Sequence, residues 1–311
     1  MNDAEPDWSE LLRQVAAEVE PHRGEGRVAD YIPALAAVDP KRFGIALVSV
    51  DGLTAKAGDH DIPFSIQSIS KVFTLALALN LLGERLWRRV WREPSGSAFN
   101  SIVQLEVHEG IPRNPLVNAG ALVITDVLVS TYGRAGAKQE ILDRMRNLSG
   151  NPNLRMDPIV AASELETAHR NAGLAYVMKG FKNINNDVDD LLDVYCHQCA
   201  IAMSCADLAR AALFLCNHGH DPLRDISVVS AVAARRINAI MLTCGHYDAA
   251  GDFAYRVGLP GKSGVGGGIL AVVPRRLAVA VWSPGLNEFG NSQVGTLALE
   301  ALVRRSGLAI L

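Results

Sequence analysis

Ser68 and Lys71 are the two residues whose types and spacing point most directly to chemistry. A serine hydroxyl becomes a nucleophile when a neighbouring base takes its proton, and a lysine in apolar surroundings has a lowered pKa that suits it to be that base. Residues three apart share one face of a helix, and the free N–H groups of a first helical turn can stabilise an oxyanion. The pair indicates serine-based acyl transfer, although Ser-x-x-Lys alone is also typical of a helix N-cap followed by a surface lysine.

The segment that carries this pair predicts a buried central helix. Residues 72–82 are apolar on nearly every side, which indicates a helix surrounded by other elements. Pro63 favours a start soon after it, and Gly83 favours a stop. We therefore expect Ser68 and Lys71 in the first turns of this helix.

The glycine-rich stretch Gly261-Lys-Ser-Gly-Val-Gly-Gly-Gly268 is the second candidate. Arg256 stands where a P-loop needs glycine, and Ile269 stands where the dinucleotide-binding pattern needs one, so no nucleotide site is predicted. Lys262-Ser263-Gly264 differs by one residue from Lys-Thr-Gly, which accompanies Ser-x-x-Lys in penicillin-binding proteins and β-lactamases. We expect the backbone of an edge strand here to approach a substrate closely and to offer an N–H to an oxyanion.

Two other motifs have ordinary structural explanations. Ser149-Gly150-Asn151 matches the Ser-x-Asn element of the same enzymes, but its place before Pro152 is typical of a turn. Cys196-His-Gln-Cys199 contains one Cys-x-x-Cys, not two, and its spacing fits no common zinc site. We expect buried helix thiols there and no metal.

Composition narrows the function classes. The 311 residues carry a net charge of -3, so we expect no nucleic-acid partner. Five cysteines in a chain of this size indicate reduced thiols in a cytoplasmic protein. The first residues are acidic, unlike a signal peptide, and the apolar run 72–82 is too short to span a bilayer, so we expect no membrane association.

Hydrophobic patterning places strands near both ends of the chain and helices between them. Strands are predicted at 43–50, 54–58, 268–273 and 277–283, and helices at 8–20, 72–82, 118–132, 137–148, 163–181, 204–218, 226–242 and 292–306. Asp51-Gly52 predicts a hairpin turn, 84–93 a solvated helix face and 183–190 a polar loop, and no strand is expected between about 71 and 220. We predict a single domain of the α/β (α+β) class with a mainly antiparallel sheet flanked by helices. Residues 1–70 and 221–311 would form its sheet subdomain, and residues 71–220 an all-helical subdomain.

Seven motifs in order give residues 18–311 a resemblance to the serine-type glutaminases. They are Val28-Ala-Asp-Tyr-Ile-Pro, Gln67-Ser-Ile-Ser-Lys-Val-Phe, Arg113-Asn-Pro-Leu-Val-Asn-Ala-Gly, Ser163-Glu through Arg170-Asn-Ala, Val194-Tyr, Cys244-Gly-His-Tyr-Asp and Gly261-Lys-Ser-Gly-Val-Gly-Gly-Gly. Those enzymes have the β-lactamase/penicillin-binding-protein fold and hydrolyse L-glutamine to L-glutamate and ammonia. The resemblance implies the same fold and substrate for this chain, no metal or organic cofactor, and a homo-oligomer, either a dimer or a tetramer.

The resemblance also implies roles for particular residues. Ser68 would be the nucleophile, Lys71 its base, and Tyr247 the residue that supplies or relays the proton to departing ammonia. The backbone N–H groups of Ser68 and Val265 would form the oxyanion hole. The substrate would be held by these same residues around the reacting carbon and by Tyr31, Gln67, Asn118, Glu164, Asn171 and Tyr195.

The chemistry of these side chains fits glutamine. A buried Glu164 suits the substrate's ammonium, and asparagine amides and tyrosine hydroxyls can donate to its carboxylate. Glu164 and Asn171 are seven residues apart, so two turns of one helix would turn both toward one pocket. Taken singly, each residue also has a plain structural explanation, as a core tyrosine, an N-cap or a surface carboxylate.

Two alternatives stay open. A β-lactamase- or esterase-like hydrolase would not need Glu164 for an α-ammonium, and a non-catalytic penicillin-binding-like sensor would acylate and stop. Tyr195 or Lys71 could replace Tyr247 as the proton donor. His197 is unusual for the family, His246 stands where methionine is common, and Ala250 stands where serine is common. None of these replaces a named catalytic residue, but His246 beside Tyr247 leaves the pH dependence open.

Overall fold

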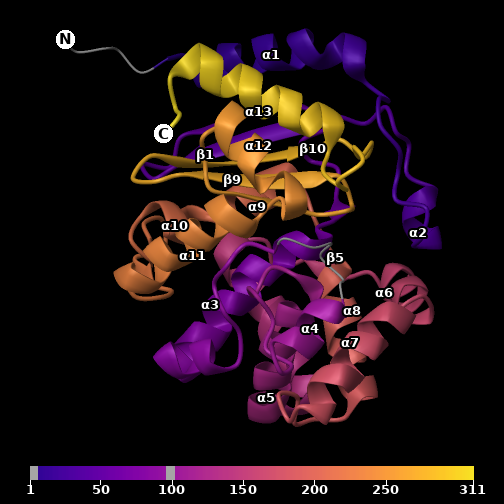
Figure 1. Ribbon diagram of the computed structural model, residues 1–311. Helices are drawn as coiled ribbons and strands as arrows, with labels where there is room; N and C mark the ends of the chain where they lie inside the picture. The colour runs from indigo at the N-terminus through magenta and orange to yellow at the C-terminus, as the bar shows by residue number, and fades with distance from the viewer. Residues whose placement is uncertain (1–5, 96–101) are drawn as a thin grey trace.

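The computed structural model describes residues 6–95 and 102–311, so the acidic residues 1–5 lie outside the described chain. A five-stranded antiparallel sheet forms the centre of its upper half in Figure 1. Its strands, in the order β2-β1-β10-β9-β8, are β2 (Thr54–Gly58), β1 (Gly44–Ser49), β10 (Leu277–Trp282), β9 (Gly268–Val273) and β8 (Gly261–Ser263). Gly44 pairs with Trp282, so segments from the two ends of the chain meet in the middle of the sheet.

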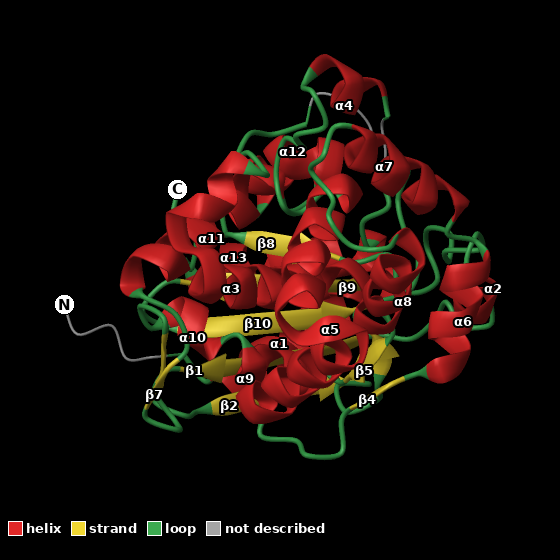
Figure 2. Cartoon of the chain, turned by 90° about the horizontal axis from the view of Figure 1, so that it is seen from below, coloured by secondary structure: helices red, strands yellow, loops and turns green. Residues whose placement is uncertain are grey.

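The expected strands are confirmed, including the hairpin at Asp51-Gly52 that joins β1 to β2. β8 is an addition: the sequence placed Lys262 and Ser263 just before a strand, but they form the edge strand itself. Figure 2 shows β8, β9, β10, β1 and β2 side by side behind the helices of the other half.

Alternating side chains give the sheet two apolar faces. Ile45 and Leu47 of β1 pack with Val279 and Val281 of β10 beneath α1 (Trp8–Val19) and α13 (Gln293–Ser306), which lie above the sheet in Figure 1. The residues between them, such as Ala46 and Ala278, face α9 (Cys205–Ala211) and the helical half. Both terminal helices are confirmed, and Ser292 caps α13 by accepting from the Gly295 N–H.

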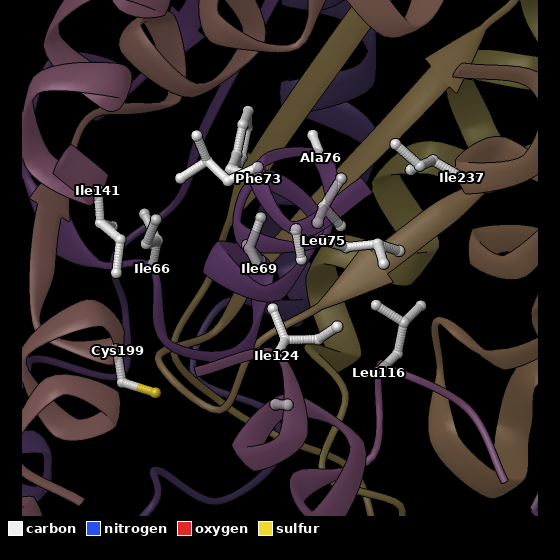
Figure 3. Packing of buried hydrophobic residues seen from close by; sticks show 14 of the residues in the cluster. Ile66, Ile69, Phe73, Leu75, Ala76, Leu116, Ile124, Ile141, Cys199 and Ile237 are labelled. Carbon is white, nitrogen blue, oxygen red and sulfur yellow. The ribbon is translucent and has the colours of Figure 1, made fainter. Parts of the chain in front are cut away.

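The central helix is confirmed as α3 (Ser70–Leu82), which ends at Gly83. It is apolar all round because other elements surround it: Figure 3 shows Ile69, Phe73 and Leu75 packed among residues of neighbouring segments. Ser68 does not lie in α3. It belongs to a short 3-10 helix, η2 (Gln67–Ile69), that leads directly into it, with Lys71 one turn further on.

Several predicted helices have different boundaries. Those at 118–132 and 137–148 form one helix, α5 (Asn118–Ser149), interrupted where Gly133 takes a φ of 69°. The predicted helix 163–181 is two helices, α6 (Pro158–Glu166) and α7 (His169–Gly180). Residues 204–218 also divide, into α9 and α10 (Leu213–Cys216), whereas 226–242 becomes α11 (Ala231–Cys244) because Ser230 caps a later start.

Residues 71–220 are mainly helical, but the expectation that they contain no strand is wrong. β4 (Arg155–Met156) and β5 (Ile201–Met203) join β3 (Phe64–Ser65) in a small sheet, and β6 (His220–Asp221) pairs with β7 (Ile226–Ser227). The remaining short helices are α2 (Pro33–Ala36), α4 (Val103–Val107) and α12 (Ala250–Arg256). No helix within the described residues is long and apolar enough to cross a membrane.

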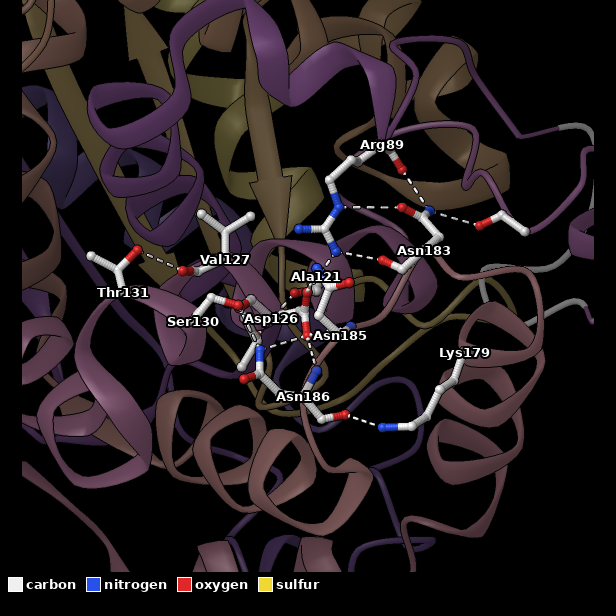
Figure 4. Close-up of polar contacts among 12 residues, drawn as sticks. Arg89, Ala121, Asp126, Val127, Ser130, Thr131, Lys179, Asn183, Asn185 and Asn186 are labelled. Carbon is white, nitrogen blue, oxygen red and sulfur yellow. Dashed lines mark hydrogen bonds and ion pairs between the residues drawn. The ribbon is translucent and has the colours of Figure 1, made fainter.

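The predicted polar loop 183–190 is shorter than expected, because α8 (Val188–Cys199) begins in it behind the cap Asp187. A buried polar network fixes what remains of the loop (Figure 4). The Asp126 carboxylate pairs with Arg89 at 2.6 Å and accepts from the backbone N–H groups of Asn185 and Asn186 at 3.0 and 2.9 Å. Arg89 is therefore not part of a solvated helix face. Its ion pair anchors the loop that leads into α8.

Candidate active site

A cavity of about 310 Å³ gathers almost all of the residues that the sequence singled out. Lys71 and Lys262 do not belong to its lining and are both buried. The lining residues come from eight separate segments, namely Tyr31 before α2, Gln67 and Ser68 from η2, Asn118 from α5, Glu164 from α6, Asn171 from α7, Tyr195 from α8, Tyr247 from a 3-10 turn after α11, and Val265 from the turn between β8 and β9.

Ser68 lines this cavity, and Lys71 is buried behind it. Lys71 is 1% exposed, and its Nζ donates to Asn118 Oδ1 at 2.7 Å and to the Leu116 carbonyl at 3.4 Å. Burial lowers the pKa of Lys71 to about 8. Among the described residues Lys71 makes no hydrogen bond to Ser68.

Tyr247 lines the cavity together with Ser68. Burial raises the pKa of Tyr247 to about 12, so the phenol keeps its proton at neutral pH. Its backbone has a φ of 55°, the left-handed region that a tyrosine seldom adopts. Such strain persists only where the surroundings impose it, so the fold holds Tyr247 in place at this cavity.

Lys262 lies beside the Tyr247 ring and is fully buried, although its motif predicted a role for the backbone only. Its Nζ lies 4.4 Å from the centre of the Tyr247 ring and donates to the carbonyls of Gly245 at 3.1 Å and Ser263 at 2.5 Å. Burial, and then the nearby charge of Lys71, hold the pKa of Lys262 well below its usual range.

The glycine-rich turn after β8 passes close to Ser68. A Cβ on Gly264 would lie 2.5 Å from the Ile66 carbonyl, and one on Gly266 would lie 2.2 Å from the Ser65 carbonyl, so both positions require glycine. The turn places Val265 at the cavity wall across from Ser68. Within residues 6–95 and 102–311, neither the Ser68 N–H nor the Val265 N–H has a hydrogen-bond partner, so both are available as donors.

Glu164 marks the other end of the cavity and is 7% exposed. Its carboxylate accepts from Gln67 Nε2 at 3.2 Å, and the same Nε2 donates to Ser65 Oγ at 3.0 Å. Burial raises the pKa of Glu164 to about 7, against the opposing effect of hydrogen bonds from Gln67 and Cys199. This site favours ionisation of Glu164 when a cation enters.

Asn118 connects the two ends of the cavity. Its Oδ1 accepts from Lys71 Nζ and from the Tyr195 hydroxyl at 3.3 Å, and its Nδ2 donates to Asn171 Oδ1 at 3.0 Å. Glu164 and Asn171 do face one cavity, but from the two helices α6 and α7, not from two turns of a single helix.

Comparison with known proteins accounts for nearly all of the chain. The family model described as Glutaminase matches residues 26–311. The chain belongs to the glutaminase family. A glutaminase of Rhizobium etli (strain CIAT 652) is 57% identical over 98% of each chain, and one of Methylorubrum populi is 58% identical over 98% of this chain and 99% of the other.

Solved structures of glutaminases superpose closely. The probable glutaminase from Bacillus subtilis complexed with 6-diazo-5-oxo-L-norleucine has a TM-score of 0.89 and 33% identity, covering 100% of this chain and 99% of its own. Mglu in its glutamate form has a TM-score of 0.93 and 35% identity, covering 99% of this chain and 70% of its own. The predicted fold class, a mainly antiparallel sheet with helices in a β-lactamase-like arrangement, is confirmed.

The sequence of this glutaminase-family chain did not single out every residue of the cavity. Ile32, Thr167, Ala168 and Arg170 also line it, with Arg170 exposed at its mouth. Arg170 and Thr167 lie between Ser163 and Asn171, within the motif that carried the resemblance, so proximity to Asn171 was the available signal.

The two motifs with ordinary explanations lie outside the site. Ser149-Gly150-Asn151 forms the turn that ends α5, with Gly150 at a φ of 74°. Cys196 and Cys199 are buried thiols on α8, as expected, with Cys199 beneath Glu164. In the described part of the chain, no three His, Cys, Asp or Glu side chains gather in a way that would hold a metal ion.

Proposed function

We propose that this chain is a glutaminase that hydrolyses L-glutamine to L-glutamate and ammonia through a Ser68 glutamyl ester. The observation that carries the proposal is a buried carboxylate, Glu164, in the same cavity as Ser68 with its lowered-pKa neighbour Lys71. A serine hydrolase for acyl groups in general would have no use for that carboxylate. A substrate with an ammonium some distance from its scissile carbonyl would.

In the proposed acylation step, neutral Lys71 takes the proton of Ser68 as its Oγ attacks the carboxamide carbon of glutamine. The oxygen of the tetrahedral intermediate accepts from the Ser68 and Val265 N–H groups. Tyr247 gives its proton to the leaving nitrogen and regains one from Lys71, so ammonia departs as a neutral molecule. The presence of Tyr247 and Ser68 in one cavity supports this placement of the donor.

In the proposed deacylation step, water attacks the ester carbonyl and restores Ser68, with the proton again passing through Tyr247 or Lys71. Lys262 would hold the Tyr247 side chain in position. Held by two main-chain carbonyls beneath the Tyr247 ring, it fixes the phenol beside the nucleophile. Every step uses groups of the chain itself.

We propose that the protein recognises its substrate through the two charged groups of the substrate, the α-ammonium and the α-carboxylate. Glu164 would pair with the α-ammonium, with Gln67 holding the carboxylate in place. The amide of Asn171, the hydroxyls of Tyr31 and Tyr195 and the amide of Asn118 would surround the α-carboxylate. The Bacillus subtilis relative is complexed with 6-diazo-5-oxo-L-norleucine, a compound with glutamine's ammonium and carboxylate and a diazoketone in place of the carboxamide, which supports the same reading here.

Three further features of the protein belong to this proposal. Residues 1–70 and 221–311 would form the sheet subdomain and 71–220 the helical one, supported by the pairing of β1 with β10. A cytoplasmic location is supported by five free cysteines, all buried. The homo-oligomer, a dimer or a tetramer, rests on the resemblance to the family.

The experiment is ammonia release by the purified protein from L-glutamine, with L-asparagine and a chromogenic β-lactam in parallel. Steady turnover of L-glutamine, with far lower kcat/KM for the other two compounds, is expected. Turnover of the β-lactam at a comparable kcat/KM would favour the hydrolase alternative instead. A single burst of ammonia equal to the enzyme concentration would favour the sensor that acylates and stops.

A further inference from the structure

Gln67 directly precedes the nucleophile, and its backbone has a φ of 48°, in the left-handed region that glutamine seldom adopts. The residue is 2% exposed and lies in η2, the short helix that carries Ser68 into the cavity. Strain of this kind persists only where neighbouring groups impose it, and it is concentrated at functional sites. Because the backbone of Gln67 sets the direction in which the chain enters Ser68, the position of Ser68 depends on what holds Gln67.

A directed chain of hydrogen bonds holds the side chain of Gln67. The Ser65 hydroxyl donates to the Cys199 carbonyl at 2.9 Å, which leaves its oxygen to accept, and it accepts from Gln67 Nε2 at 3.0 Å. The same nitrogen donates to Glu164 Oε2 at 3.2 Å. An amide nitrogen has two hydrogens, and both are used within the protein, so the Gln67 amide has no N–H left for a substrate.

These contacts connect the segment of the nucleophile to the other walls of the cavity. Glu164 lies on α6, so the bond from Gln67 joins η2 to the helix that carries the buried carboxylate. The turn that carries Val265 packs against the same side chain, because a Cβ on Gly266 would lie 3.5 Å from Gln67 Cγ. Gln67 therefore lies between the groups proposed to attack, to bind the oxyanion and to bind the ammonium.

The strength of the bond from Gln67 to Glu164 depends on the charge of Glu164. A hydrogen bond to an ionised carboxylate is stronger than one to a neutral carboxyl group. Burial disfavours ionisation of Glu164 and raises its pKa to about 7, whereas a cation beside the carboxylate favours ionisation. An ammonium that enters the cavity therefore strengthens the bond by which Glu164 holds Gln67.

We propose, on the basis of the glutaminase function above, that Gln67 is a positioning residue that couples the substrate's ammonium to the nucleophile. An ammonium paired with Glu164 strengthens the bond from Gln67, and the strengthened bond holds the left-handed backbone of Gln67. Ser68 is then kept in the orientation from which it attacks. A compound without an ammonium loses this effect as well as the ion pair, so the ammonium raises the rate of acylation in addition to the affinity.

The test supplies the acyl group and the ammonium as separate molecules. p-Nitrophenyl acetate is the acyl donor, and L-alanine provides an ammonium and a carboxylate without a side-chain carbonyl. L-Lactate is the matched effector, because it has a hydroxyl in place of the ammonium. The measured rate is nitrophenolate release by the whole protein, less the release by Ser68→Ala. We expect saturating L-alanine to raise this rate about three- to tenfold, the size of one strengthened hydrogen bond, and L-lactate not to raise it.

Variants assign the acceleration to Gln67. Gln67→Met keeps the length of the side chain and removes the amide, so the acceleration by L-alanine should fall below about twofold. Gln67→Asn tolerates the left-handed backbone, but its amide is one methylene further from Glu164, so the acceleration should also be lost. Gln139→Met is the matched control, because Gln139 donates to the Asp143 carboxylate at 2.8 Å on the exposed side of α5, and it should respond as the wild type does. Inhibition of glutamine hydrolysis by L-alanine shows that the effector still binds each variant.

The proposal is overturned if L-alanine does not accelerate the wild type, if L-lactate accelerates it equally, or if Gln67→Met keeps the acceleration. A merely structural role of Gln67 would lower the rates with and without L-alanine together and leave their ratio unchanged. Steady ammonia release from L-glutamine without acceleration by L-alanine would overturn this role alone and leave the proposed function standing. Equal nitrophenolate release by the wild type and Ser68→Ala would instead show that Ser68 is not acylated, which would contradict both proposals.

Discussion

The two ends of the candidate active-site cavity are held in different ways. At the nucleophile end, main-chain carbonyls contact both buried lysines. Lys262 donates to Gly245 O and Ser263 O, and Lys71 donates to Leu116 O at 3.4 Å in addition to its shorter bond of 2.7 Å to the Asn118 side chain. At the other end, side chains hold side chains, as in the bond from Gln67 to Glu164. Asn118 belongs to both ends, because it accepts from Lys71 and donates to Asn171.

This difference suggests a division of labour. Main-chain carbonyls are fixed by the fold, so they hold a reacting group in one place, and as neutral dipoles they leave a buried lysine with a lowered pKa. A side-chain network instead offers charges and amides to a substrate, and removing one member leaves its neighbour unpartnered. Substitutions at the nucleophile end should therefore lower kcat, and those at the Glu164 end should act mainly on KM.

The largest effect is expected at the nucleophile end. Ser68→Ala and Lys71→Met should each lower kcat for glutamine by about 10⁴-fold or more. The first removes the attacking serine oxygen, and the second removes the base that deprotonates it. The double variant should be no worse than either single one. Ser70→Ala is the matched control, since that hydroxyl only donates to the Gln67 carbonyl, and it should keep most of the activity. Near-wild-type ammonia release by Ser68→Ala would remove the basis of the comparison.

Tyr247→Phe tests the proton donor at the same end. The amide leaving group must be protonated before it departs, whereas an ester leaving group needs less help. We expect glutamine turnover to fall about 10²- to 10⁴-fold, with a far smaller loss for a γ-glutamyl ester. Equal slowing of both substrates would transfer the donor role to Lys71 or Tyr195.

Glu164→Gln tests the opposite end. The change keeps the shape and removes the charge proposed to pair with the α-ammonium. The value of kcat/KM for glutamine should therefore fall by a factor equivalent to about 2–5 kcal/mol, chiefly through a higher KM. N-acetylglutamine, which lacks the ammonium, should be a very poor substrate of the wild type. Glu166→Gln, on the exposed side of the same helix, should behave as the wild type does. If kcat fell and KM did not change, the division between the two ends would be wrong.

The smallest effect is a change in pH dependence. Glu164 must be ionised to pair with an ammonium, and Lys71 must be neutral to act as a base; burial raises the pKa of Glu164 to about 7 and lowers that of Lys71 to about 8. Both groups act in their deprotonated forms, so kcat/KM should rise with pH through both values. In Glu164→Gln the inflection near 7 should disappear and the one near 8 should remain. An unchanged profile would mean that Glu164 does not titrate in the reaction.

The fold could be predicted from sequence wherever the pattern was long or the turn chemistry specific. The all-apolar helix α3, the hairpin at Asp51-Gly52 and the capped terminal helices are of this kind. The start of α8 was missed because Asp189 and Asp190 resemble a polar loop, although acidic residues in a first turn favour a helix. Strands of two or three residues, such as β4 and β5, are too short to show a period.

The residues of the candidate site likewise fall into those that the sequence pattern indicated and those that it did not. Ser68 and Lys71 could be found from their spacing, whereas the other roles came from the resemblance. The hydrogen bond from Lys71 to Asn118 joins two helices that are far apart in the chain, and no local sequence pattern predicts it. The break between α6 and α7 at Thr167 and Ala168 contains neither glycine nor proline, so no residue type in it predicts that Glu164 and Asn171 lie on separate helices.

The pairing of β1 with β10 also bears on how the protein is made. On the ribosome, β1 emerges early and cannot find Ala278 or Val279 of β10 until almost the whole chain has been synthesised. The helical segments between them depend on contacts between residues that are closer in the sequence, so they can form first. Until β10 is made, the β1–β2 hairpin has an unpaired apolar edge. Tyr247, Lys262 and Val265 arrive in the same late portion. A nascent chain therefore carries Ser68 for most of its synthesis without Tyr247 and Val265, so the cavity is complete only once translation is nearly finished.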